Sequence, residues 1–362
     1  MYVLKNALVS IKINWGRNIL ISVIFILITV LIVFSDICKT GVERGIMICG
    51  NVIIPSLFPF TVCVLMLMNL NITVKNKVFL KFIYYTFGQS FEMFCVMFFS
   101  MLGGYPIGCK LINDIFKNEK INSKAAHIMQ MYCVNAGPAF IISAVGCGVL
   151  RSKAVGIILF LSHISVSFVM AICSAKILRK NYIITEQKSS ENPFSEIFVN
   201  SVYSASTVVM SICAYVILFS CLNTFIAYFF ENSKFLKSII FFTEITSGIT
   251  HTKSVIFISF LLGFAGISVW CQIFALSKNV KIDFKLFILG RILHGGVSAA
   301  VTFLLLKVFN VSLTVFANIQ TVDSKIFYDG VSLSISLAIM LIVLFIFIYT
   351  KNCSRKITKD MI

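Results

Sequence analysis

Long uncharged stretches dominate the pattern of hydrophobic and polar positions along the chain. No Asp, Glu, Lys or Arg occurs in residues 18–35, 45–70, 125–150, 154–175, 254–277 and 331–350. Each stretch is near or above the roughly 18 residues that mark a candidate membrane span. Residues 197–230 are uncharged as well, and residues 286–306 are interrupted only by Arg291. The pattern predicts an all-α, polytopic membrane protein with about eight spanning helices.

Composition supports a membrane setting. Of the 362 residues, 59% are hydrophobic and 12% are charged, whereas a soluble domain carries about 25% charged residues. The net charge is +17, and the lysines and arginines lie mostly in short loops, which is typical of membrane topology and of contact with anionic lipid. No aromatic-basic platform accompanies them, so nucleic acid is not an expected partner.

The sequence carries no signal of an enzyme. It has no H-E-x-x-H motif, no Walker loop and no recognisable nucleophile elbow. The twelve cysteines form no C-x-x-C pair, and most lie in apolar stretches, where Cys behaves as a small hydrophobe. We therefore expect no catalytic residues, no cofactor and no metal site, and any transport must be passive, ion-coupled or driven by another subunit.

The basic segments predict the topology. Residues 1–17 carry three basic residues and no acid, which places the N-terminus in the cytoplasm, and the charge-balanced residues 36–44 then form a loop outside. We expect residues 82–109 to form a re-entrant hairpin rather than a single crossing, because glycines and a proline gather in its C-terminal arm. Residues 238–250 are too short to span. For both segments the sequence leaves the re-entrant and the spanning alternatives open.

The order of segments repeats in the two halves of the chain. Residues 45–175 read span, hairpin, broken span, span, and residues 200–306 read span, short broken segment, glycine-interrupted span, span. The loop charges give the two halves opposite orientations. An inverted repeat is the architecture of many secondary transporters. Arg151 and Lys153 fall outside in this arrangement, against the statistical bias. The predicted units are an N-terminal span and loop (1–44), a first repeat (45–175), a cytoplasmic basic linker (176–199), a second repeat (200–310) and a C-terminal span with a basic tail (311–362).

The first interruption lies around Pro106. It comprises Gly103, Gly104, Tyr105, Pro106, Gly108 and Lys110. Pro106 cannot donate an N–H and disfavours helix at Tyr105, and the neighbouring glycines lower helix propensity further. We expect the chain to open here and a half-helix to begin near Pro106. Its first N–H groups and its partial positive charge suit an anion.

The second interruption, Asn135-Ala136-Gly137-Pro138, repeats this device. Pro138 falls in a first helical turn, and Asn135 is the candidate N-cap. Lipid offers no water for freed backbone groups, so both interruptions must be buried in protein or line a cavity. Paired broken helices point to a transport site, and two half-helix N-termini predict that its substrate is a small anion.

Further candidates come from the second repeat. Glu244 lies in an apolar segment, where an acid either binds a coupling cation or proton or pairs with a base such as Arg291. Arg291 is a site or gate candidate, and Lys110 either attracts an anion or sets topology. Gly248 and Gly266 mark interruptions in this repeat. Ser268 and Gln272 either contact substrate or hydrogen-bond between helices. His163 and His294 are expected to be packing residues.

Several motifs, taken together and in order, resemble the YlbJ-type sporulation integral membrane proteins. The matching segments are Pro55-Ser56-Leu57-Phe58-Pro59-Phe60, Gly104 to Lys110, Asn135 to Phe140, Glu244 to Gly248 and Gly266 to Gln272. The resemblance covers residues from about 45 to 310. In this chain Ala136 stands where many relatives have a small hydroxyl residue, and Cys109 stands where they have Ala. The family belongs to the nucleoside-recognition, or Gate, group, which is similar to the core of concentrative nucleoside transporters.

The resemblance implies an integral membrane protein of the outer forespore membrane that passes dipicolinate into the forespore. The expected partners are this anion, membrane lipids, a coupling ion or proton, and other sporulation proteins. A carrier of nucleosides or other small solutes is the alternative within transport. A non-transporting membrane scaffold is the alternative from another class, but a scaffold has no need for unsatisfied backbone at mid-membrane.

Overall fold

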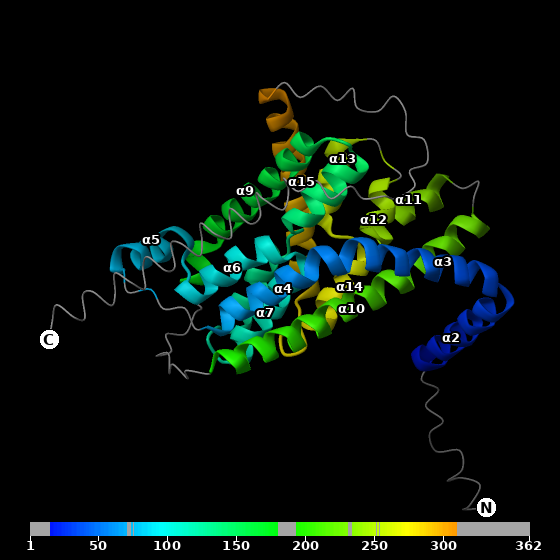
Figure 1. Ribbon diagram of the computed structural model, residues 1–362, viewed down its shortest axis with the longest axis horizontal. Coiled ribbons are helices and arrows are strands. Elements are labelled where there is room, and N and C mark those ends of the chain that lie inside the picture. The colour runs from blue at the N-terminus through cyan, green and yellow to red at the C-terminus, as the bar shows by residue number, and fades with distance from the viewer. Residues whose placement is uncertain are drawn as a thin grey trace, which may run out of the picture.

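The computed structural model describes residues 15–70, 74, 76–179, 193–230, 234–250, 252 and 254–309. Regular structure in these ranges is helical (Figure 1). Among the described residues, five segments are long and apolar enough to cross a membrane: Ser35–Asn69, Lys153–Leu178, Phe194–Phe229, Val255–Leu276 and Phe284–Val308. Shorter apolar helices cover Ile19–Val33, Phe91–Gly103 and Ala139–Val149. The all-α polytopic fold is confirmed, and the predicted span at 331–350 lies outside the described residues.

The helices fall into two series, one in each half of the chain. The first series is α2 (Trp15–Val33), α3 (Ser35–Ile48), η1 (Cys49–Ile53), α4 (Ile54–Asn69), α5 (Lys77–Phe87), α6 (Phe91–Gly103), α7 (Tyr105–Lys117), α8 (Ser123–Tyr132), η2 (Ala139–Val149) and α9 (Lys153–Leu178). The second is α10 (Phe194–Phe229), α11 (Lys234–Thr243), α12 (Ile245–Thr250), α13 (Val255–Phe264), α14 (Ile267–Leu276) and α15 (Phe284–Val308). The elements η1 and η2 are π-helical.

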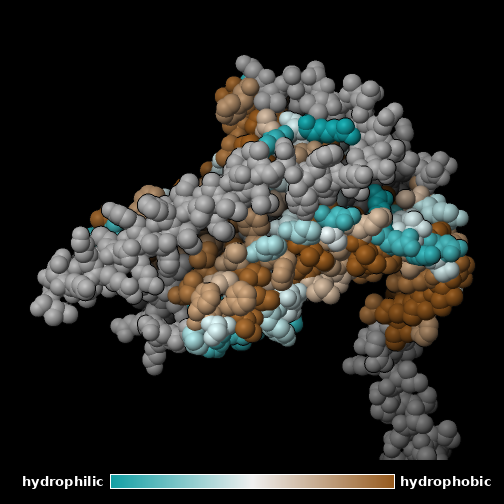
Figure 2. Space-filling view, viewed as in Figure 1, coloured by the Kyte–Doolittle hydropathy of each residue, from teal (hydrophilic) through white to brown (hydrophobic). Residues whose placement is uncertain are grey.

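Large apolar side chains lie on the outside of the molecule. Ile32 is 71% exposed, Met210 is 66% exposed and Leu304 is 58% exposed. In Figure 2 apolar side chains cover α2 and broad parts of the visible face over α4 and α10. Extensive exposed apolar surface marks contact with another apolar phase. On helices of this length that phase is the hydrocarbon of a bilayer.

The segment 36–44, predicted to be a loop, is helical instead. It lies within α3, which continues through η1 into α4. The reason is that its charges occupy one face. Lys39 and Glu43 lie one turn apart on the exposed side, where they form an ion pair, while Gly41 and Gly45 are buried. The predicted unit boundary after residue 44 therefore falls inside a helix.

The segment predicted to be re-entrant contains a hairpin of α6 and α7, which pack against each other. Its turn lies at Gly104, between the two helices. The second arm continues to Lys117, so much of the basic segment 110–124 that was expected to be a loop is helical. The hairpin is therefore shifted toward the C-terminus relative to the predicted range 82–109.

Apart from α2 and α5, which have no counterpart in the second half, the two halves contain the same order of elements. A long helix (α3 to α4, or α10) precedes a broken pair (α6–α7, or α11–α12), a second broken pair (α8–η2, or α13–α14) and a long helix (α9, or α15). The two leading helices run antiparallel along each other, because Gly41 lies against Cys221, Gly45 against Ile217, and Asn69 donates to Ser201. Figure 1 shows α3 and α4 beside α10. This order and this antiparallel packing are those of the expected inverted repeat.

Candidate functional site

The first break is a single residue in a conformation that favours glycine. Gly104 has φ +88° and ψ 176° and separates α6 from α7. Without a Cβ, glycine adopts a positive φ at little cost. Pro106 lies in the first turn of α7, where its missing N–H leaves no internal helix bond unmade. The predicted opening of the chain near Pro106 is confirmed.

The second break faces the first. The chain is non-helical from Cys133 to Gly137 and becomes helical again from Pro138. A Cβ on Gly137 would lie 3.1 Å from the carbonyl oxygen of Leu102 and 3.3 Å from the amide nitrogen of Gly104. The two interruptions, 33 residues apart in sequence, therefore meet main chain to main chain.

Unpaired backbone donors converge where the breaks meet. The N–H groups of Gly104 and Gly137 donate no hydrogen bond to any described part of the chain. The N-terminal ends of α7 and η2 begin beside them, and such ends expose further N–H groups with partial positive charge. Tyr105, Asn135 and Ala136 around this point are all buried. The arrangement can bind a solute that carries hydrogen-bond acceptors and negative charge.

The second half contains a corresponding pair of breaks. Glu244 separates α11 from α12, and its Oε1 accepts the N–H of Thr246. Ala265 and Gly266, with φ of +67° and +42°, separate α13 from α14. A Cβ on Gly266 would lie 3.4 Å from the amide nitrogen of Ile245. The Glu244 side chain is only 5% exposed, so this half places a buried acid where the first half has unpaired N–H donors.

Arg291 connects the breaks of the two halves. Its guanidinium donates to the carbonyls of Met131 and Val134, and more distantly, at 3.4 Å, to Gln130 and Gly263. The carbonyls of Gln130, Met131 and Gly263 lie at the ends of α8 and α13, and that of Val134 lies in the non-helical segment after α8. The side chain is completely buried. Among the described residues no ion pair joins Arg291 to Glu244, so the pairing considered from sequence is wrong.

A second bridge runs from the first break to the second half. The Tyr105 hydroxyl donates to the carbonyl of Leu262, in α13, at 2.6 Å. Tyr105 and Leu262 share one buried apolar cluster with Ala136, Ile245 and Ala265. The structure therefore brings residues from all four breaks into one core.

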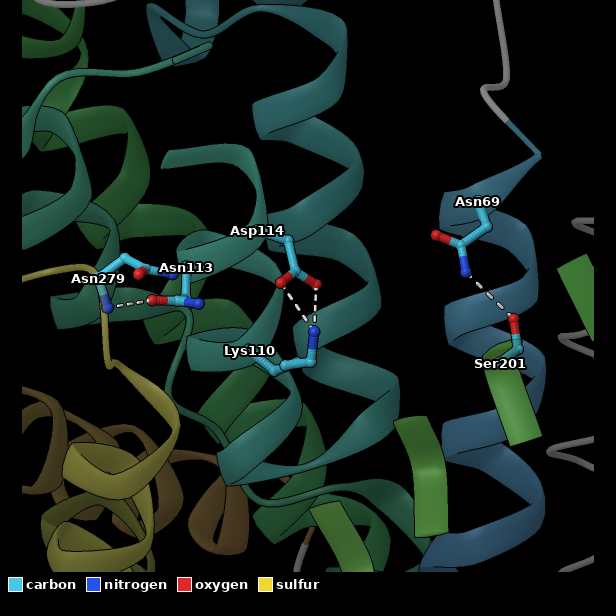
Figure 3. A network of polar contacts seen from close by, with 6 residues as sticks. All are labelled: Asn69, Lys110, Asn113, Asp114, Ser201 and Asn279. Carbon is cyan, nitrogen blue, oxygen red and sulfur yellow. Dashed lines mark hydrogen bonds and ion pairs between the residues drawn. The ribbon is translucent and has the colours of Figure 1, made fainter. Parts of the chain in front are cut away.

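Lys110 is not brought to the facing breaks. Its Nζ contacts both carboxylate oxygens of Asp114, at 2.6 and 2.7 Å, one turn further along α7 (Figure 3). Nearby, Asn113 accepts the N–H of Asn279 at 2.8 Å, which ties α7 to the loop after α14. Because Asp114 pairs with its charge, Lys110 belongs to a partly exposed ion pair on α7 and not to a buried site.

Asn135 does not cap the following helix as predicted. Its side-chain Nδ2 donates to the main-chain carbonyl of Tyr132 at 2.7 Å, and its side-chain Oδ1 accepts from the Ser167 hydroxyl at 2.7 Å. Pro138 takes the N-cap position of η2 without any side-chain hydrogen bond. Because its side chain bonds to Tyr132 and Ser167, Asn135 closes the end of α8 against α9 and does not cap η2.

The remaining candidates serve packing in this conformation. A Cβ on Gly108 would overlap the carbonyl of Cys133, and one on Gly248 would lie 2.8 Å from the carbonyl of Phe241. Gly103 ends α6, and a Cβ there would lie 2.9 Å from the side chain of Ile107. Ser268 and Gln272 are buried on α14, where the Gln272 amide lies 3.5 Å from the Ser268 hydroxyl.

A buried polar layer lies between α9, α13 and α15, and it is not among the features predicted from the sequence. Ser259 lies 3.4 Å from the Nε2 of His163 and 2.9 Å from the hydroxyl of Thr302. The rings of His163 and His294 lie 5.4 Å apart. Within the described residues neither ring nitrogen of His294 has a hydrogen-bond partner, and nor has the hydroxyl of Ser298. The signal was available, because Arg291, His294, Ser298 and Thr302 recur at helical spacing in one apolar span.

Comparisons with known proteins agree with the membrane fold. No family model matches the chain, and no solved structure matches it. The curated protein "Sporulation integral membrane protein YlbJ" of Bacillus subtilis (strain 168) is 24% identical over 347 residues. The alignment covers 82% of this chain and 84% of that protein. The chain is thus an integral membrane protein with distant homology to YlbJ over most of its length.

Proposed function

We propose that this protein acts in sporulation as a membrane carrier or channel for a small organic anion, dipicolinate being the first candidate. Its homologue is a sporulation integral membrane protein. The outer forespore membrane is the proposed location, because dipicolinate must cross it to enter the forespore.

The observation that carries the proposal is the meeting of Gly104 and Gly137. Two unpaired N–H groups and two half-helix N-termini converge there inside the protein. A scaffold gains nothing from unsatisfied backbone in an apolar interior, because each such group costs free energy. A solute with carboxylates would supply the missing acceptors, and helix N-termini are ready-made anion sites.

Charge at the junction favours an anion as well. Arg291 stays charged because guanidinium is not deprotonated in proteins, and its partners are neutral main-chain carbonyls. The first half therefore offers unpaired donors, and Arg291, from α15 of the second half, adds a buried cation at the end of α8. Glu244, an acid buried in the second half, is the group proposed to take up a coupling cation or proton, because intramembrane acids commonly lie on ion or proton pathways.

Uptake into proteoliposomes tests the proposal. The purified full-length protein is reconstituted, and uptake of labelled dipicolinate is compared with uptake of labelled uridine, with protein-free liposomes as the control. Saturable dipicolinate uptake without uridine uptake is expected. Uptake of uridine alone would show that the protein is a nucleoside carrier. If neither solute is taken up under any imposed ion gradient, the scaffold function would be favoured instead.

A further inference from the structure

We propose that Cys38 and Cys221 form a disulfide bond that joins the two halves of the chain. Their Sγ atoms lie 3.6 Å apart, across 183 residues of sequence. Cys38 belongs to α3 and Cys221 to α10. The bond is a covalent modification that does not depend on which solute the protein carries.

Close helix packing sets up this geometry. A Cβ on Gly41 would lie 2.7 Å from the Cα of Cys221, and one on Gly45 would lie 2.7 Å from the Cα of Ile217. The two glycines form a G-x-x-x-G pattern, which lets helix backbones approach closely. Cys38 lies one turn before Gly41 on the same face of α3, so its thiol meets Cys221 at the point of closest approach.

The close approach of α3 and α10 matters because a disulfide can form only between cysteines whose Cα atoms lie close together. Their Cα atoms lie about 4.4–6.8 Å apart, whereas helices with larger side chains at the contact pack with axes about 8–10 Å apart. The two sulfurs already touch, and must close to about 2.05 Å. Bond formation therefore needs an adjustment of two side chains and no rearrangement of helices.

Cys38 and Cys221 lie at a depth in the interface where charged, water-exposed side chains of α3 are close by. Lys39 and Glu43, in the same turns of α3 as Cys38, have side chains that are 74% and 59% exposed. Thiol–disulfide exchange needs a thiolate and access for its partner. The basic segment 1–17 predicts that this end of α3 lies outside the cytoplasm, where no reducing pool keeps thiols free.

A second cysteine pair in the same interface provides a contrast. The Cys49 thiol donates to the carbonyl of Cys213 at 3.7 Å, and Cys49 begins η1, about three turns beyond Cys38. Both residues are buried, whereas in the first pair Cys221 is buried but Cys38 is half-buried and gives an oxidant access. Cys49 and Cys213 also lie within the apolar cluster of this interface. Without water they cannot exchange readily, so we expect this pair to remain as thiols.

The bond forms by two exchange steps. The Cys38 thiolate attacks a dithiol oxidoreductase in its disulfide form, which gives a mixed disulfide and frees one thiol of the oxidoreductase. The Cys221 thiolate then attacks the Cys38 sulfur and releases the second thiol. The two cysteines lose two protons and two electrons, and the oxidoreductase gains them as its dithiol.

Differential alkylation of the full-length protein in native membranes tests the proposal. Membranes are quenched in acid and denatured, free thiols are blocked with light N-ethylmaleimide, and disulfides are then reduced and labelled with heavy N-ethylmaleimide. Peptide mass spectrometry should find heavy label on Cys38 and Cys221 in most molecules, and light label on Cys49 and Cys213. Light label on all four would overturn the proposal.

Two matched variants identify the partner. In Cys38→Ser, Cys221 should change from heavy to light label, whereas in Cys49→Ser it should stay heavy. Heavy label on Cys221 in Cys38→Ser would show a different partner and contradict the proposal. The wild-type measurement decides the question even if a variant fails to fold.

Discussion

At the scale of single residues, Arg291 resolves a problem that broken helices create. The last carbonyls of a helix lack internal partners and carry partial negative charge. Arg291 contacts such carbonyls at the ends of α8 and α13, one from each half. Its planar fork of five donors suits several acceptors at once. The buried cation therefore needs no carboxylate from Glu244.

Replacing Arg291 should destabilise the protein. In Arg291→Met the side chain keeps its bulk but leaves buried carbonyls without donors, so the free energy of unfolding should fall by about 3 kcal/mol. Arg291→Lys should lose less, because one ammonium serves some of the carbonyls. Thermal unfolding in detergent measures both, with the surface substitution Lys307→Met as the control. A wild-type unfolding temperature for Arg291→Met would contradict this role.

Gly108 allows a second prediction at this scale. Because a Cβ there would overlap the Cys133 carbonyl, Gly108→Ala should force the hairpin away from the second break and lower the unfolding temperature by several degrees, as overpacking of about 1–3 kcal/mol does. Gly296→Ala is the matched control, because no atom lies within 4 Å of its Cβ position. Equal unfolding temperatures for the two variants would show that the contact with Cys133 is not tight.

At the scale of elements, the lengths of α6 and α7 explain the hairpin. Each helix has 13 residues, which at 1.5 Å per residue is about 20 Å. The hydrocarbon core is about 30 Å thick, so neither arm crosses it alone. Because the arms pack on each other and turn at Gly104, both outer ends should lie on one side of the membrane.

Cysteine accessibility checks this arrangement. Introduced cysteines at Asn76 and Asn118, both exposed, should react with a membrane-impermeant maleimide from the same side. A cysteine at Arg151, which follows the crossing made by α8 and η2, should react from the opposite side. Labelling of positions 76 and 118 from opposite sides would mean that the α6–α7 segment spans the membrane.

The sequence predicts the breaks well and the loops less well. Gly104 and Pro138 are confirmed because glycine and proline act locally, on the backbone that they occupy. The segment 36–44 was mistaken for a loop because four charges in nine residues look like a connection, although Lys39 and Glu43 share one helix face. The partners of Arg291 and Asn135 lie on other helices or in non-helical turns, and no local pattern encodes such contacts.

At the scale of the whole molecule, the two halves form one structure. The leading helices α3 and α10 run antiparallel, and Tyr105 and Arg291 each bond from one half to the other. The layer of His163, Ser259 and Thr302 adds a further contact between the halves. The four breaks therefore gather in one interior, as a solute site shared by two repeats requires.

The central claim, that the facing breaks form the solute site, is tested most directly by dipicolinate uptake in Gly137→Leu. The new side chain would fill the space between Leu102 and Gly104, and the matched variant Gly296→Leu adds the same side chain where no atom lies within 4 Å. With equal reconstitution, Gly137→Leu should lose uptake by about tenfold or more, as losing ~1.4 kcal/mol of binding does, while Gly296→Leu transports normally. Unchanged uptake by Gly137→Leu would contradict the account.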